Sequence, residues 1–163
     1  MTRSDVHILL VDDNTSSLEV LCEVLTRANY NVTPAASGQD ALTVVRGSAL
    51  DLAILDFDLP DTTGIELLQQ IRQFCPGLPV ILMSANVSPG LQLDAFEAGA
   101  YTFMRKPLNL QQLLRFVGRA LEFGQQWAGS RMAKKGEEAT ITKQTVQVKQ
   151  SIFVKWIRII RQK

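Results

Sequence analysis

Short apolar runs alternate along the chain with stretches in which apolar residues recur every three or four positions. The short runs indicate buried strands, and the periodic stretches indicate amphipathic helices. Strands are expected at residues 6–11, 31–36, 52–57, 80–83 and 101–104, and helices within residues 18–28, 38–46, 65–75, 91–98 and 110–121. Strict alternation of five strands with five helices predicts a parallel sheet that helices cover on both faces. Because Pro34 cannot donate a hydrogen bond to a neighbouring strand, the second strand is expected at an edge.

The third apolar run stops abruptly at Asp56, which places a carboxylate at the carboxyl end of a buried strand. Open α/β sheets bind ligands at that edge. Other expected strands end there in polar groups, which are Asp12 and Asp13 after the first strand, Ser84 after the fourth and Lys106 after the fifth. We therefore predict that Asp56 is a nucleophile that accepts a phosphoryl group, with the other side chains supporting it.

The supporting residues fit this chemistry. A carboxylate attacks a phosphoryl group poorly because both are negative, so a metal ion and fixed cations must neutralise the developing charge. Asp12 and Asp13 offer the oxygen ligands that Mg²⁺ prefers. Lys106, the only lysine among residues 1–123, suits a carboxylate or a phosphoryl oxygen, and the Ser84 hydroxyl can donate to the same group. Each residue alone could instead cap a helix or lie on the surface, but their convergence on one edge favours the chemical interpretation.

Charge is divided unevenly along the chain. Residues 1–123 hold 8 Lys and Arg against 14 Asp and Glu, whereas residues 124–163 hold 9 against 2. The acidic first part is therefore not expected to bind nucleic acid non-specifically, which leaves only the tail open to it. Cys22 and Cys75 lack the spacing of a metal site or a disulfide framework and are expected to be apolar fillers. The sequence has no signal-peptide pattern and no apolar run of membrane-spanning length, so we expect a cytoplasmic protein.

Together the motifs at the strand ends resemble those of the receiver domain of two-component response regulators. They are Asp12–Asp13, residues 56–60 followed by Gly64, Ser84–Ala85, Gly99–Ala100 with Phe103, and Lys106–Pro107. The resemblance covers residues 6–123 in one register. It implies an α/β, flavodoxin-like (βα)5 fold, doubly wound around a parallel sheet with strand order 2-1-3-4-5.

The resemblance also implies a role for each acidic residue. Asp56 would take a phosphoryl group from a histidine kinase or a phosphotransfer protein. Asp12, Asp13 and Asp56 would hold Mg²⁺ together with the backbone carbonyl of Asp58. Such a domain catalyses only its own phosphorylation and dephosphorylation, so no other enzymatic activity is expected.

A second set of residues would carry the response to phosphorylation. By the same resemblance, Ser84 and Lys106 would bind the phosphoryl oxygens, and the Lys106–Pro107 peptide bond would be cis. Phe103 matches the aromatic switch of the family, while Tyr101 lies two positions too early. The surface around the fourth helix and the fifth strand would then contact a downstream effector or a second copy of the chain.

Two other interpretations fit part of this pattern. Residues 56–58 are also similar to the nucleophile and acid of haloacid-dehalogenase-type phosphatases, but Leu59 and Pro60 replace the Gly and Thr or Val of that motif. A receiver that is never phosphorylated and serves only as a binding module is disfavoured because every phosphorylation residue is present. His7 lies early in its strand, away from the acidic edge, and is expected to be structural.

The composition changes at residues 124–126, a few residues after the apolar spacing of the last expected helix ends at Leu121. The expected organisation is a receiver domain at residues 1–123 followed by a linker and basic tail at residues 124–163. Residues 151–162 predict a helix with an apolar and a basic side, which are formed by Ile152, Phe153, Trp156, Ile157, Ile159 and Ile160, and by Lys155, Arg158 and Arg161. Such a helix suits a partner protein, a second copy, the acidic receiver surface or an anionic membrane. No specific nucleic-acid contact is expected.

Overall fold

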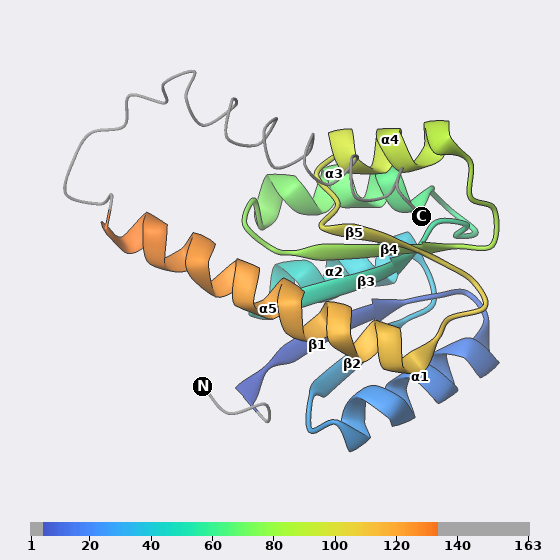
Figure 1. Cartoon of the computed structure of the whole chain (residues 1–163), viewed down its shortest axis with the longest axis horizontal. Helices are drawn as coiled ribbons and strands as arrows, with labels where there is room; N and C mark the ends of the chain where they lie inside the picture. Colours follow the sequence, from blue (N-terminus) through green and yellow to red (C-terminus); the bar gives the residue numbers. More distant parts are fainter. Residues whose placement is uncertain (1–4, 134–163) are drawn as a thin grey trace, which may run out of the picture. The chain divides into compact units, whose positions relative to one another are not determined.

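The computed structural model describes residues 5–133, in which five strands alternate with five helices as the sequence predicts (Figure 1). The strands are β1 (His7–Val11), β2 (Asn31–Ala35), β3 (Leu52–Asp56), β4 (Val80–Ser84) and β5 (Thr102–Arg105). The helices are α1 (Thr15–Arg27), α2 (Gly38–Gly47), α3 (Gly64–Phe74), α4 (Pro89–Glu97) and α5 (Leu110–Ala133). Polar side chains at Asn14, Ser37, Thr63 and Ser88 cap the first four helices by accepting a backbone N–H of the first turn.

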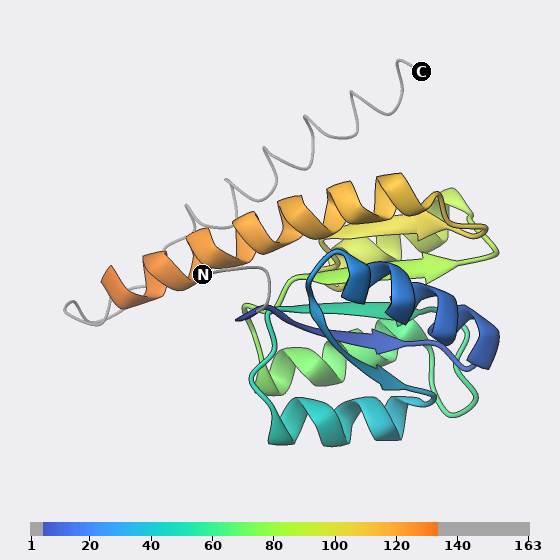
Figure 2. The same ribbon diagram turned by 90° about the horizontal axis from the view of Figure 1, so that it is seen from below.

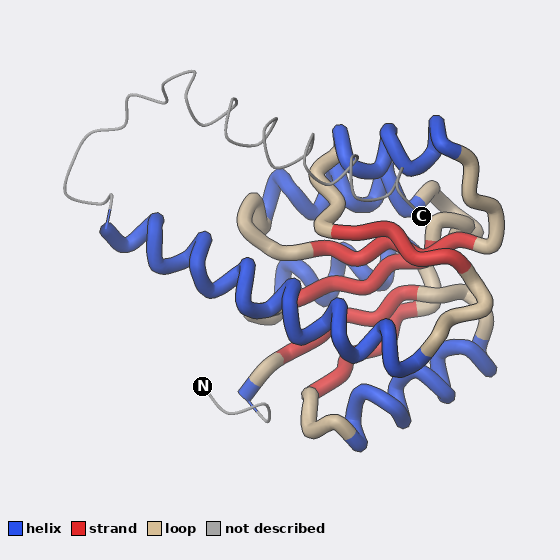
Figure 3. The backbone as a smooth tube through the Cα atoms, in the orientation of Figure 1, coloured by secondary structure: helices blue, strands red, loops and turns tan. Residues whose placement is uncertain are grey.

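The five strands form one parallel sheet in the order β2-β1-β3-β4-β5, which confirms the flavodoxin-like fold (Figure 3). Strand β2 with Pro34 lies at an edge, as predicted. In this register Val11 pairs with Leu55, and Asp56 pairs with Met83. The strand ends that carry polar residues therefore reach the same edge of the sheet.

Helices lie over both faces of the sheet (Figure 2). The sheet separates two apolar cores, one beneath each layer of helices. Helices α2, α3 and α4 cover one face, with Leu68 and Ala95 among the buried residues. Helices α1 and α5 cover the other face, with Leu25 and Val117 buried. Burial on both faces explains why β1, β3 and β4 are nearly continuous apolar runs.

Helix α5 corrects one expectation from the sequence. Its apolar spacing extends in the sequence to Leu121, but the helix continues to Ala133. A Cβ atom on Gly124 would lie 3.2 Å from the Pro79 ring, so the absence of a side chain allows the helix to approach Pro79 closely. The proposed tail helix at residues 151–162 lies outside the described residues. None of the helices within residues 5–133 has the length and apolar character needed to cross a membrane.

Candidate functional site

A lysine bridges two buried carboxylates at the carboxyl edge of the sheet. Asp56, the last residue of β3, is 4% exposed, and Asp12, directly after β1, is fully buried. The Lys106 Nζ lies 2.8 Å from Asp12 Oδ2 and 2.9 Å from Asp56 Oδ2. The structure thus brings together residues that are 94 positions apart in the sequence. The predicted convergence of these three side chains is observed.

Backbone hydrogen bonds extend past the strand ends and hold the site in place. The Lys106 N–H donates to the Ser84 carbonyl over 2.8 Å, and the Phe57 N–H donates to the Met83 carbonyl over 2.7 Å. The Lys106–Pro107 peptide bond is cis, as the family resemblance implied. The side chains of the site therefore start from backbone that the sheet itself positions.

Asp13 completes an acidic cluster with the two buried aspartates. One carboxylate oxygen from each of Asp12, Asp13 and Asp56 lies within 4.8 Å of the others, and Asp13 is exposed. Three ionised carboxylates and one ammonium leave two negative charges in excess. Oxygen donors with that balance fit a hard divalent cation. Asp58, which was expected to contribute its backbone carbonyl, is exposed in the loop after β3.

The ionisable groups of the cluster influence one another. Burial raises the pKa of the Asp56 carboxyl, and the hydrogen bond and positive charge of Lys106 oppose that shift. Burial alone would lower the pKa of Lys106, but hydrogen bonds to Asp12 and Asp56 raise it overall. Lys106 is therefore held as a cation between two carboxylates. This arrangement keeps a fixed positive charge beside Asp56.

Ser84, the last residue of β4, is buried beside this cluster but uses its hydroxyl locally. Its Oγ donates to the Asn86 carbonyl over 3.0 Å and accepts the Asn86 N–H over 3.1 Å. The predicted contact with a phosphoryl group would require the hydroxyl to leave this carbonyl. The position predicted from the sequence is right, and the local turn with Asn86 was not anticipated.

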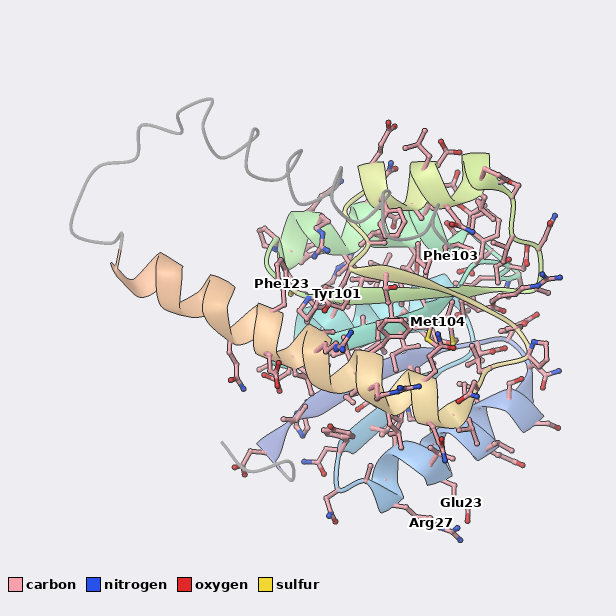
Figure 4. The ribbon with its side chains drawn as sticks, in the orientation of Figure 1. Glu23, Arg27, Tyr101, Phe103, Met104 and Phe123 are labelled. Carbon is pink, nitrogen blue, oxygen red and sulfur yellow. The ribbon has the colours of Figure 1, made fainter. Side chains whose placement is uncertain are left out.

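Phe103 in β5 and Tyr101, which directly precedes this strand, lie on different faces of the sheet (Figure 4). Phe103 is half-buried against the core beneath α4, and the next residue, Met104, points to the core beneath α5. The Tyr101 ring contacts Phe123 of α5, with ring centroids 5.4 Å apart. Phe103 is thus the aromatic residue that α4 covers, whereas Tyr101 belongs to the α5 side.

The loop between β3 and α3 is held tightly to the end of β3. The Gly64 N–H donates to the Phe57 carbonyl over 2.7 Å, and a bridge pairs Asp58 with Thr63. A Cβ atom on Gly64 would lie 2.5 Å from the backbone oxygen of Asp56. Any side chain there would displace the backbone at Asp56. Glycine is therefore required at position 64 by the packing of the site.

The same loop carries a residue that the sequence interpretation missed. Asp61 accepts the N–H groups of Gly38 and Gln39, over 2.8 and 2.9 Å, at the start of α2. No local sequence pattern links these positions, which lie 23 and 22 residues away. His7 begins β1, is exposed and lies at the other end of that strand from Asp12, in agreement with a structural role.

The fold and this cluster define a receiver domain. The chain matches the response regulator receiver domain family over residues 8–117, and it belongs to this family. It is 36% identical over 121 residues to the transcriptional regulatory protein ZraR of Salmonella typhimurium, a match that covers 74% of this chain and 27% of that protein. The chain thus spans about a quarter of the length of the curated relatives it matches.

Solved structures agree with this assignment. A CheY-like receiver domain from Methanospirillum hungatei JF-1 has a TM-score of 0.72 and 30% identity, with 74% of this chain and 97% of that chain covered. The non-phosphorylated HemR receiver domain from Leptospira biflexa has a TM-score of 0.67 and 34% identity, covering 71% and 94%. Family membership decides against the phosphatase interpretation. The residues therefore form a receiver domain of the kind that accepts phosphoryl groups in two-component systems.

Proposed function

We propose that Asp56 accepts a phosphoryl group from a histidine kinase or a phosphotransfer protein. The observation that carries this proposal is the bridge from Lys106 to both Asp56 and Asp12 at the carboxyl edge of the sheet. Lys106 holds Asp56 Oδ2, and we assign the attack on phosphorus to Oδ1. The bond from phosphorus to the donor nitrogen breaks as the bond to Oδ1 forms, and the donor imidazole leaves with the electron pair.

Mg²⁺ is the cofactor that the acidic cluster fits best. Asp12, Asp13 and Asp56 would hold it through their carboxylates, and Asp58 through its backbone carbonyl. When bound, the ion offsets the negative charge of the carboxylates and of the incoming phosphoryl group. Lys106 contributes a further positive charge to the phosphoryl oxygens. The domain would catalyse its own phosphorylation and dephosphorylation and no other reaction.

Phosphorylation would change the surface around α4 and β5. The new group adds nearly two charges and three acceptors, so the Ser84 hydroxyl would leave the Asn86 carbonyl and donate to it. Phe103, which packs beneath α4, would then move inward. This surface would contact a downstream effector or a second copy of the chain. The relative ZraR named above is a transcriptional regulatory protein, but the acidic residues 1–123 favour a protein partner over specific nucleic acid.

We further propose that the receiver domain comprises residues 1–123 and that residues 124–163 form a basic tail. The charge change between the two parts supports this division. The tail would act in assembly or output, on a partner, a second copy, the receiver surface or an anionic membrane. A kinase that supplies phosphoryl groups in this way would meet the protein in the cytoplasm.

Intact mass spectrometry after incubation with acetyl phosphate tests the assignment of Asp56. Wild type should gain one phosphoryl group only when Mg²⁺ is present, and Asp56→Asn should gain none. Asp51→Asn is the matched control because Asp51 lies just before β3, at the opposite end of the strand from Asp56. Labelling of Asp56→Asn to the same extent as wild type would overturn the assignment. Wild type that binds Mg²⁺ without being labelled would favour the binding module.

A further inference from the structure

The start of α2 is capped by two side chains from different parts of the chain. Ser37 precedes the helix, and its Oγ accepts the Asp40 N–H over 3.1 Å. Asp61 comes from the β3–α3 loop, and its two carboxylate oxygens accept the Gly38 and Gln39 N–H groups. These N–H groups have no partner within the helix, and a carboxylate also suits the positive end of the helix dipole. Asp61 therefore joins the loop to a helix that lies elsewhere in the sequence.

The loop and the helix approach each other closely at this join. A Cβ atom on Gly38 would lie 2.4 Å from the Thr62 methyl group and 3.3 Å from both Asp61 carboxylate oxygens. A side chain at position 38 would force the Thr62 side chain to shift, so glycine favours this approach. The contact is thus specific in shape as well as in hydrogen bonding. It anchors the loop at a point five residues after Asp56.

The anchored loop also carries a group with a proposed role at the metal site. Asp58 pairs with Thr63 across the loop, and Thr63 begins the capping box of α3. The loop thus has one anchor on α3 and a second on α2. Mg²⁺ demands near-ideal octahedral geometry, so a small displacement of a ligand carbonyl weakens its binding. Residues behind the metal ligands commonly matter for this reason.

We propose that Asp61 is a positioning residue, whose carboxylate fixes the β3–α3 loop against α2 and thereby holds the Asp58 carbonyl in place for Mg²⁺. The inference rests on the proposed function of the acidic cluster. Asp61 itself lies outside that cluster and is assigned no contact with the ion. Its effect should therefore appear in the affinity for Mg²⁺ and not in the chemistry at saturating Mg²⁺.

The test compares Asp61→Ala with Ser37→Ala in the full chain. Both variants lose a cap of the same helix, but only Asp61→Ala releases the loop. The Mg²⁺ concentration for half-saturation, measured from amide chemical shifts, should rise about tenfold in Asp61→Ala and stay within about twofold of wild type in Ser37→Ala. Both should lose a few degrees of melting temperature. Labelling of Asp61→Ala by acetyl phosphate should recover at high Mg²⁺.

The inference can fail alone or together with the proposed function, and the two failures can be told apart. Equal Mg²⁺ affinity in wild type and Asp61→Ala, with labelling of wild type intact, would show that Asp61 is only a helix cap. Wild type that neither binds Mg²⁺ nor is labelled would overturn the proposed function as well. If Asp61→Ala does not fold, the Mg²⁺ affinity of Asp61→Asn is measured in its place. The amide oxygen of Asp61→Asn can still accept from the Gly38 N–H, but the Gln39 N–H loses its acceptor. An unchanged Mg²⁺ affinity in Asp61→Asn would likewise overturn the inference.

Discussion

Helices α3 and α4 cover the same face of the sheet but bury very different amounts of apolar side chain against it. Helix α3 buries Leu67, Leu68 and Ile71 completely. Helix α4 buries only Ala95, and its Leu93 remains 42% exposed. A buried leucine stabilises a helix by far more than a buried alanine, at about 0.8 kcal/mol for each buried CH₂ group. Helix α4 is therefore the weakly held element of this layer.

The position of α4 gives this difference a functional meaning. It follows Ser84 in the chain, and it covers the half-buried Phe103. A groove between α3 and α4 is lined by Phe57, which directly follows Asp56, and by Ile65 and Leu91 among others. Elements that move in a switch come from the less stable parts of a fold. Movement of α4 against a fixed α3 would reshape this groove.

The largest expected difference between the two helices is in global stability. Leu68→Ala on α3 removes a completely buried side chain and should lower the free energy of unfolding by about 2–5 kcal/mol. Leu91→Ala on α4 removes a half-buried one and should cost about 1 kcal/mol. Urea denaturation followed by circular dichroism measures both. Equal losses would show that α4 is held as firmly as α3.

The sequence predicts much of the site because parallel strands bring their carboxyl ends to one edge. An apolar run that ends in a polar residue thus locates Asp12, Asp56, Ser84 and Lys106, wherever they fall in the chain. The apolar spacing in α3 likewise predicts its buried side. The roles of these residues remain predictions, whereas the convergence of Asp12, Asp56 and Lys106 and the fold are confirmed.

Other features depend on contacts that no local pattern encodes. Asp61 reaches α2 across 23 residues, and its position in a turn gives no sign of that partner. Gly124 begins the compositional break in the sequence, but in the structure it packs against Pro79 inside α5. Glycine is common both at breaks between elements and where a helix approaches another segment closely, so composition alone cannot distinguish the two. The Ser84 hydroxyl likewise bonds to Asn86, a local partner that the apolar run before it does not indicate.

A second difference concerns local opening and its response to phosphorylation. Amides of α4 should exchange with solvent at least about tenfold faster than those of α3 in the unphosphorylated protein. A beryllofluoride mimic on Asp56 should change exchange in α4 by a similar factor and leave α3 within about twofold. The physical reason is the proposed movement of the Ser84 hydroxyl away from Asn86, just before α4. Hydrogen exchange measured by mass spectrometry resolves the two helices.

Two serine variants control this experiment. Ser84→Ala lacks the hydroxyl that would follow the phosphoryl group, so α4 should respond much less to the mimic. Ser88→Ala removes the cap of α4 and should speed exchange with and without the mimic by the same factor. The interpretation fails if α3 and α4 respond alike, or if Ser84→Ala responds as wild type does.

The smallest expected difference is in how the stabilising contribution of the first turn of α3 and of α4 depends on pH. Glu66 in the first turn of α3 accepts the Thr63 N–H over 3.0 Å, and this bond lowers the pKa of its carboxyl. A lowered pKa in the folded state means that the carboxylate stabilises the fold above the unfolded pKa of about 4.3, and that this contribution is lost as the pH falls through the folded value. Glu66→Gln should therefore melt slightly below wild type at pH 7, and the gap should close in acid. Helix α4 has no acidic residue in its first turn, so the loss of melting temperature in Ser88→Ala should not vary over the same pH range. Thermal melts of both variants between pH 7 and pH 3 provide the measurement. A difference in melting temperature between wild type and Glu66→Gln that persists in acid would show that the charge of Glu66 does not stabilise α3.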